Sequence, residues 1–180
     1  MHILAVSGSL RAASKNATVL EAARLVALPA VVIELDDSIG VLPHYNPDLD
    51  ALDGAGMPEA AARWRARVAA ADAVLISSPE YAHGVPGVLK NALDWLVSST
   101  EFPGTPVALL TASPLSVHAP AQLRETLRTM NARFVDEASV TVPLDGSRHH
   151  ARAVAEDPEL GALLRGALGA LARAVTGARD

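Results

Sequence analysis

The sequence predicts a three-layer α/β fold, in which a five-stranded parallel sheet lies between two layers of helices. Short runs that are apolar throughout alternate with segments of helical periodicity, a pattern typical of parallel strands buried on both faces. Because crossovers between parallel strands are right-handed, two doubly wound strand orders are common, and the order 2-1-3-4-5 suits five strands better. The chain has 180 residues, of which 50% are hydrophobic, so we expect a single domain over residues 1–180.

The elements follow one another without a long linker. Apolar runs predict strands at residues 2–7, 30–35, 73–77, 106–112 and 134–142. Helical spacing predicts helices at 14–26, 58–71, 85–97, 119–130 and 158–175, and residues 36–56 are predicted to form a loop. Ser14 suits the N-cap of the first helix, while Pro58 and Pro86 suit the first turns of the next two. The last helix carries an apolar stripe that suits a helix covering the sheet, formed by Leu160, Leu163, Leu164, Leu168, Leu171 and Val175.

Composition excludes several classes of function. The absence of cysteine removes disulfides, thiolate metal sites and iron–sulfur clusters. Fifteen Lys+Arg against 20 Asp+Glu give a net charge of −5, which argues against a nucleic-acid partner. No apolar run reaches the roughly 18 residues of a membrane-spanning helix, and a strand-like run follows Met1 without a signal-peptide pattern. We therefore expect a cytoplasmic protein with no membrane partner.

The loop after the first predicted strand has the composition of an anion site. Parallel α/β sheets bind ligands beyond the carboxyl ends of their strands, at the switch point beside strand 1. The loop over residues 7–18 has the spacing of neither a Walker A loop nor a GxGxxG loop. It does place hydroxyl and amide groups and one guanidinium at a helix N-terminus, which suits a phosphate monoester: Ser9, Arg11, Ser14, Asn16 and Thr18. The alternative is an N-capping cluster beside a solvent-exposed arginine.

The loop after the third predicted strand is long enough to line a flat ligand. Two prolines and two glycines within residues 79–87 fix its backbone, and Tyr81 offers an aromatic wall or a hydroxyl. By default His83 is an exposed loop histidine, and Lys90 with Asp94 is a solvent-facing pair four residues apart. Leu89 and Trp95 are expected to pack in the interior.

These two loops resemble the signatures of the NADPH-dependent FMN reductase family. The first stands here as GSLRAASKN at residues 8–16, and the second as PEYAHGVPGVLKNALDW at residues 79–95. Two long motifs in the right order, after the right strands, make the resemblance specific, and it covers about one full domain. It implies a flavodoxin-like three-layer sandwich with the strand order 2-1-3-4-5 that the sequence pattern also predicts.

The resemblance implies FMN, bound without a covalent link, as the cofactor and NADPH or NADH as the co-substrate. Its phosphate would be held by Ser9, Arg11, Ser14 and Asn16, with Thr18 nearby. The isoalloxazine ring would lie along Pro79, Glu80, Tyr81, Ala82 and His83, largely beside backbone atoms. Electrons would pass from NAD(P)H through the flavin to a small acceptor such as a quinone, an azo compound, a metal oxyanion or free flavin. The flavin carries the chemistry, so no catalytic side chain is required. Dimers or tetramers are usual in the family.

The chain departs from the family pattern in two places. Ala82 and His83 stand where the family often has Asn and Gly. The loop at residues 111–120, after the fourth predicted strand, has no glycine where the family has a glycine-rich stretch, although Ser113 and Ser116 remain as hydrogen-bond donors. We expect either that this loop takes another path or that flavin binds more weakly.

The sequence leaves two other functions open, and several other motifs do not fit a known kind of site. A flavodoxin-like electron carrier would usually be more acidic and richer in aromatic residues, and a divergent member that has lost flavin could act as an interaction protein. Ser113 and His118 do not stand in a GxSxG motif, so a hydrolase is not indicated. Neither the aspartates at 48, 50 and 53 nor His149-His150 have the ligand pattern of a metal site, and we predict none.

Overall fold

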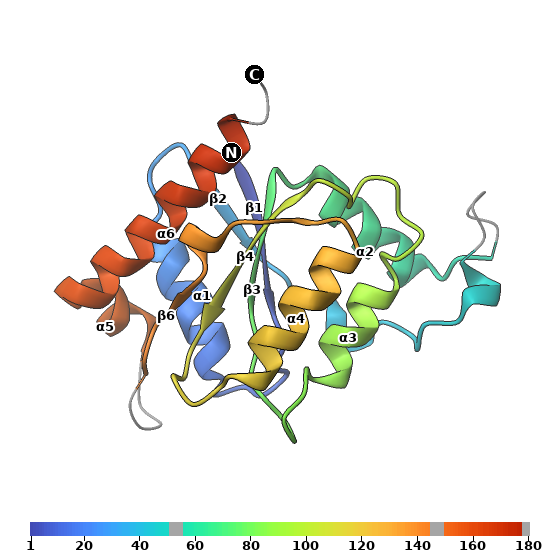
Figure 1. Ribbon diagram of the computed structural model, residues 1–180, viewed down its shortest axis with the longest axis horizontal. Coiled ribbons are helices and arrows are strands. Elements are labelled where there is room, and N and C mark those ends of the chain that lie inside the picture. The colour runs from blue at the N-terminus through green and yellow to red at the C-terminus, as the bar shows by residue number, and fades with distance from the viewer. Residues whose placement is uncertain (51–55, 145–149, 178–180) are drawn as a thin grey trace.

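The computed structural model describes residues 1–50, 56–144 and 150–177. Figure 1 shows one twisted sheet between two groups of helices. The strand order is β2-β1-β3-β4-β5 and every pairing is parallel, so the predicted order 2-1-3-4-5 is confirmed. The strands are β1 (His2–Ser7), β2 (Val32–Leu35), β3 (Ala73–Ser77), β4 (Pro106–Thr111), β5 (Arg133–Phe134) and β6 (Val140–Thr141).

The fifth predicted strand is broken into two short pieces. β5 pairs with the start of β4, and β6 pairs with its end, opposite Leu110 and Thr111. Between them lies a 3₁₀ turn at Asp136–Ala138. The side chain of Ser139 replaces the missing strand backbone, because its hydroxyl accepts from Leu109 N at 3.1 Å and donates to Val135 O at 2.9 Å. The continuous strand predicted at 134–142 is therefore wrong, and a serine side chain completes the edge of β4.

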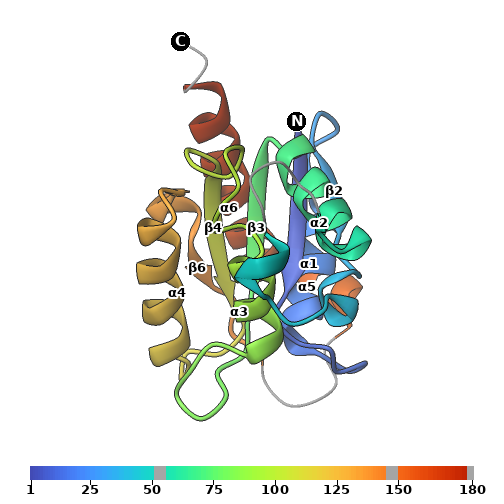
Figure 2. The same cartoon turned by 90° about the vertical axis from the view of Figure 1, so that its right-hand side faces the viewer.

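The helices form two layers, one on each face of the sheet (Figures 1 and 2). One layer holds α1 (Lys15–Leu25), α5 (Ala151–Glu156) and α6 (Pro158–Thr176); the other holds α2 (Glu59–Ala70), α3 (Gly87–Asp94) and α4 (His118–Thr129). Successive residues of β1 face opposite layers, with Ile3 and Ala5 packed in one core and Leu4 and Val6 in the other. Both faces are thus buried, as the uninterrupted apolar runs predict.

The helix bounds differ modestly from those expected. Ser14 caps α1 by accepting from Ala17 N at 3.3 Å, as predicted. Pro58 and Pro86 occupy the N-cap positions, one residue before the helices rather than inside their first turns. The short helix α5 was not predicted, and it ends where Asp157 begins α6 by accepting from Glu159 N and Leu160 N. The stripe of α6 packs against the sheet, with Leu164, Leu168 and Leu171 buried. No helix in the described ranges is both long enough and apolar enough to cross a bilayer.

The loops that follow β1, β3 and β4 gather at the carboxyl edge of the sheet, the lower edge in Figure 1. The first two loops touch at Gly8, whose N–H donates to Ser77 O at 2.8 Å. A Cβ at Gly8 would lie 2.6 Å from Ser78 Oγ, closer than real contacts allow. Glycine at this position therefore lets the two predicted ligand loops lie against each other.

A buried carboxylate, Asp50, fixes the long segment between β2 and α2. Its oxygens accept from Arg65 Nη2 at 2.6 Å, from Ser98 Oγ at 2.7 Å and from Tyr45 OH at 3.0 Å. Burial of the phenol, followed by its hydrogen bond to Asp50, raises the pKa of Tyr45. Asp50 therefore holds an internal ion pair, and Asp53, its neighbour in the aspartate-rich stretch of the sequence, lies outside the described residues.

Replacing Asp50 tests this ion pair. Asp50→Ala would leave the Arg65 guanidinium, whose side chain is 17% exposed, without its carboxylate. Breaking a buried pair costs about 3–5 kcal/mol, and the partial exposure of Arg65 favours the lower end of that range. We expect urea unfolding of Asp50→Ala to show a free energy of unfolding lower by about 3 kcal/mol.

The exposed Asp48 supplies a matched control two residues away. Asp48→Ala is expected to change the free energy of unfolding by no more than about 0.5 kcal/mol. Equal effects of the two substitutions would contradict the role given to Asp50.

Candidate functional site

A pocket of about 360 Å³ opens at the N-terminus of α1. The loop after β1, the start of α1 and the loop after β3 form its walls, through Ser9, Arg11, Ala13, Ser14, Lys15, Asn16, Pro79 and Tyr81. Residues of the first and second motifs, about 65 positions apart in the sequence, therefore line one cavity. This pocket lies at the carboxyl edge of the sheet beside strand 1, where doubly wound folds place their ligands.

The pocket is electropositive where it meets the N-terminus of α1. Arg11 is exposed, and among the described residues its guanidinium pairs with no carboxylate. Lys15 brings a second cation, whose Nζ donates to Leu144 O at 2.8 Å. The N–H groups of Lys15 and Asn16 are the first two of α1, and a helix leaves such groups without an intrahelical acceptor. Two cations and the positive end of a helix dipole together favour an anion here.

Asn16 points into the protein as well as lining the pocket. Its side chain is buried, and its Oδ1 lies 3.0 Å from the hydroxyl of Ser77, the last residue of β3. The same hydroxyl donates to Leu110 O of β4 at 2.7 Å. Asn16 thus fixes the start of α1 against the ends of two strands, a positioning role that the sequence pattern did not indicate.

A second pocket of about 190 Å³ adjoins the first on the side of the loop that follows β4. The two share Lys15, Asn16 and Pro79, and the second adds Ser78, Glu80, Ala112, Ser113 and Ser116. The glycine-free loop at 111–120 forms its far wall by folding into a turn, in which Ser116 N donates to Ser113 O at 3.2 Å. None of residues 111–120, all of which the structure describes, has a positive φ. The loop therefore reaches this path without glycine, and weaker flavin binding stays a prediction.

The second motif turns sharply at Ala82 and His83. Tyr81 and Gly84 exchange two backbone hydrogen bonds, of 3.1 and 2.9 Å, across a two-residue turn. Ala82 has a φ of 49° and His83 a φ of 60°. Two successive residues at positive φ define a turn of type I′, for which Asn-Gly is the favoured sequence. The Ala-His pair keeps the turn at a conformational cost, of order 1–2 kcal/mol for each residue.

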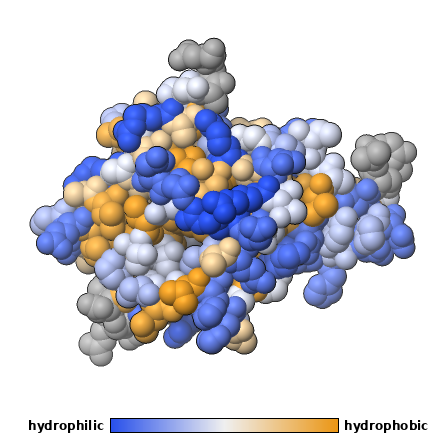
Figure 3. All heavy atoms as spheres, viewed as in Figure 1, coloured by the Kyte–Doolittle hydropathy of each residue, from blue (hydrophilic) through white to orange (hydrophobic). Residues whose placement is uncertain are grey.

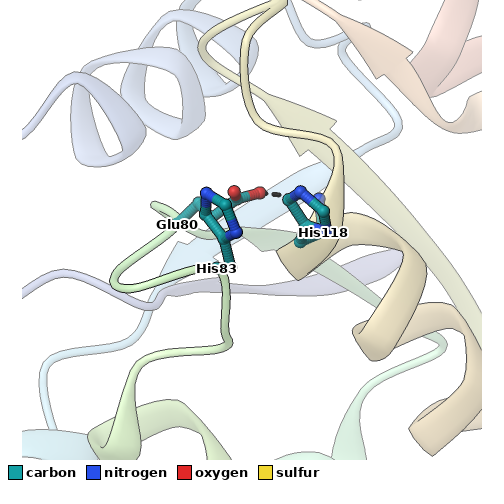
Figure 4. Close-up of side chains that lie close together, drawn as sticks. All are labelled: Glu80, His83 and His118. Carbon is teal, nitrogen blue, oxygen red and sulfur yellow. Dashed lines mark hydrogen bonds between the residues drawn. The ribbon is translucent and has the colours of Figure 1, made fainter.

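Glu80 joins the loop after β3 to the start of α4. Its Oε2 accepts from His118 N at 2.7 Å (Figure 4) and from Ala119 N at 2.9 Å. The bond from Ala119 N, supported by that from His118 N and by the nearby imidazoles, lowers the pKa of Glu80 below its usual value. Glu80 is therefore an ionised cap of α4, and its side chain borders the second pocket.

Most of the predicted site residues lie together. Six of them line the first pocket, and Glu80 and Ser113 line the second with Asn16 and Pro79. Thr18, Ala82 and His83 line neither, and the Thr18 hydroxyl donates to Ser14 O within the helix. Sequence reasoning missed Lys15, which lines both pockets. Its place between Ser14 and Asn16, at the first position of the helix, was the available signal.

Comparison with known proteins agrees with this geometry. The model of the family described as NADPH-dependent FMN reductase matches residues 1–146. An NAD(P)H-dependent FMN reductase of Pseudomonas aeruginosa is 39% identical over 147 residues, which cover 79% of this chain and 77% of that protein. A quinone reductase of Pseudomonas putida is 38% identical over 117 residues, covering 62% of this chain and 60% of that protein.

Solved structures extend the likeness to the whole chain. FerB, a flavoenzyme NAD(P)H:(acceptor) oxidoreductase from Paracoccus denitrificans, superposes with a TM-score of 0.77 at 28% identity, covering 98% of this chain and 97% of its own. Since the family model spans residues 1–146 and its two motifs line one electropositive pocket, the chain belongs to the NADPH-dependent FMN reductase family, and it is an oxidoreductase that uses FMN with NAD(P)H as the electron donor.

Proposed function

We propose that FMN binds across the two joined pockets and that this enzyme passes electrons to a small planar quinone. The observation that carries the proposal is that the two pockets adjoin, since they share Lys15, Asn16 and Pro79 in their linings. One end is cationic and lies at a helix N-terminus, and the other is lined by a proline-rich loop and two serines. A charged phosphate ester attached to a flat ring system has the same two-part chemistry.

The phosphate end is supported by the groups around α1. Ser9 and Arg11 line the pocket together with Lys15 and Asn16, the first two residues of α1, and Lys15 adds a second charge. Ser14 already accepts from Ala17 N, which leaves its hydroxyl proton available for a phosphate oxygen. A phosphate monoester accepts several such bonds at once, and charge-assisted bonds are the stronger ones. These residues fit the cofactor of the family.

The ring end is supported by the loops after β3 and β4. Pro79 and Tyr81 form an apolar wall, and Ser113 accepts from Leu115 N at 3.3 Å, so its own proton can be donated to a ring oxygen or nitrogen. When bound, FMN supplies the two-electron chemistry between NAD(P)H and the acceptor. The protein's part is to hold the phosphate, flank the ring and leave one side of it open.

A quinone acceptor is favoured by the surface around the site. Large apolar side chains stand exposed on the three loops at its rim, namely Leu10, Tyr81, Leu115 and Val117, with Leu115 86% exposed. Figure 3 shows hydrophobic residues toward the lower edge of the molecule, over the loop that follows β4. A flat, uncharged acceptor gains by covering such a rim, whereas a metal oxyanion does not. The related quinone reductase of Pseudomonas putida supports the same choice.

Self-association as a dimer or tetramer, implied by the family resemblance, is part of the same proposal. A second copy placed against these exposed side chains would remove them from water and narrow the access to the ring. Light scattering on the FMN-loaded protein would report a mass above that of one 18.7 kDa chain.

The phosphate assignment predicts a ligand-specific effect of Arg11. Arg11→Ala is expected to weaken FMN binding by roughly 10- to 150-fold, because a charge-assisted contact contributes about 1.5–3 kcal/mol. Riboflavin, which has no phosphate, should bind Arg11→Ala and the unaltered protein equally well. Fluorescence titration of the flavin-free protein with each ligand gives both values.

Arg63 provides the control for Arg11, because it is exposed and pairs with Glu59 on α2. Arg63→Ala should leave both flavins unaffected. If Arg11→Ala lowered the affinities for FMN and for riboflavin equally, the guanidinium would lie away from the phosphate.

The acceptor assignment predicts faster NADPH oxidation when a quinone is added. With the FMN-loaded protein in the absence of oxygen, 1,4-benzoquinone should sustain turnover with one NADPH consumed for each quinone reduced. Chromate at equal concentration should be reduced more slowly, because the exposed rim offers it no favourable contact. Faster turnover with chromate would contradict the quinone assignment, and turnover with neither would favour the electron-carrier alternative.

A further inference from the structure

Three potential metal ligands meet where the loop after β3 touches the start of α4. Glu80 and His83 come from that loop and His118 from the first position of α4, 35 residues further along the chain. One ligand atom from each lies within 4.8 Å of the others. Figure 4 shows the two imidazoles side by side, with the Glu80 carboxylate beside them. Two imidazoles and a carboxylate in this arrangement are side chains that commonly bind metal ions, and flavin binding does not use them together.

We propose that Glu80, His83 and His118 bind a divalent first-row transition metal, for which Zn²⁺ is the suitable probe. Imidazole nitrogen suits Zn²⁺, Cu²⁺, Ni²⁺ and Fe²⁺, and a carboxylate oxygen completes a three-ligand set. Zinc sites with three protein ligands keep the remaining position for water or another ligand. All three side chains are accessible, His83 and His118 being exposed and Glu80 half-buried, so an ion can enter directly from solvent.

The carboxylate is oriented in advance. Oε2 of Glu80 accepts two backbone hydrogen bonds from the start of α4, and a carboxylate has about four lone-pair sites, so it can bind an ion without losing them. Outer hydrogen bonds of this kind hold metal ligands in place.

The two histidines are close but not yet in ligand geometry. Their rings stack with centroids 4.2 Å apart and planes 12° apart. Bonds of 2.0–2.1 Å in a tetrahedral site place ligand atoms about 3.3 Å apart, so ligand atoms that lie within 4.8 Å of one another must approach by at most about 1.5 Å. Both rings must also rotate until one nitrogen of each points to a common centre. Exposed side chains can make this movement, because little packing opposes it.

The turn that carries His83 supports the same conclusion. His83 has a φ of 60°, a conformation that costs a branched or bulky residue energy and that glycine would adopt freely. This unfavourable backbone conformation occurs at the residue whose imidazole lies beside a second imidazole and a carboxylate. A bound ion would tie the turn to α4 and fix one border of the second pocket, to which Glu80 belongs. Metal binding at these three residues is independent of which acceptor the enzyme uses.

Isothermal titration calorimetry with ZnCl₂ tests the site on the tag-free, FMN-loaded protein in a buffer that does not coordinate metals. We expect one Zn²⁺ per chain. His83→Asn keeps the positive φ, which asparagine tolerates, and removes the imidazole. His118→Gln keeps the helix start and the backbone N–H to Glu80. Loss of one ligand should lower the affinity for Zn²⁺ by about 100-fold in each variant. This is the upper end of the losses seen when outer-shell partners are removed.

The controls are two exposed histidines elsewhere in the described chain, His44 and His150. His44→Gln and His150→Gln should bind one Zn²⁺ with unchanged affinity. X-ray absorption at one equivalent of Zn²⁺ should show two imidazole ligands in the unaltered protein and one in His83→Asn. The proposal would be overturned by absence of Zn²⁺ binding to the unaltered protein, by unchanged affinity in His83→Asn and His118→Gln, or by loss of binding in His150→Gln alone.

Discussion

The buried hydroxyl of Ser77 is the contact on which the site depends. It lies at the carboxyl end of β3, donates to Leu110 O of β4 and sits 3.0 Å from the side chain of Asn16 at the start of α1. The carbonyl of the same residue accepts from Gly8 at the end of β1. One residue therefore joins three strands and a helix. The helix N-terminus, with its cations, is held against the end of the sheet by this junction.

The chemistry that follows is built mainly from backbone and charge. The cationic end of the pocket consists of a helix N-terminus, a capping serine and the side chains of Arg11 and Lys15. The opposite end consists of two loops whose shapes are set by turns, one at Ala82-His83 and one at Ser113–Ser116.

Much of the fold could be predicted because it depends on short-range pattern. The limits of β1 and β3 agree with the apolar runs, and Ser14 caps α1 as its type and place suggest. The prediction of a continuous fifth strand was wrong because the Ser139 side chain makes hydrogen bonds that strand backbone would otherwise make. Hydropathy does not reveal such a replacement. Helix α5 was missed because six residues give too short a periodic pattern. For the site, the two motifs identified most of the pocket. The meeting of Glu80 and His83 with His118 was not predictable, since it depends on a cap formed between distant segments.

A crystal structure of the FMN-loaded protein tests the central claim most directly. The account predicts that the phosphate lies at the N-terminus of α1, within hydrogen-bond distance of Ser9, of Arg11 and of the first N–H groups of the helix. The ring should then lie along Pro79 and Tyr81 toward Ser113. A phosphate bound away from α1, or a ring placed outside the two joined pockets, would contradict it.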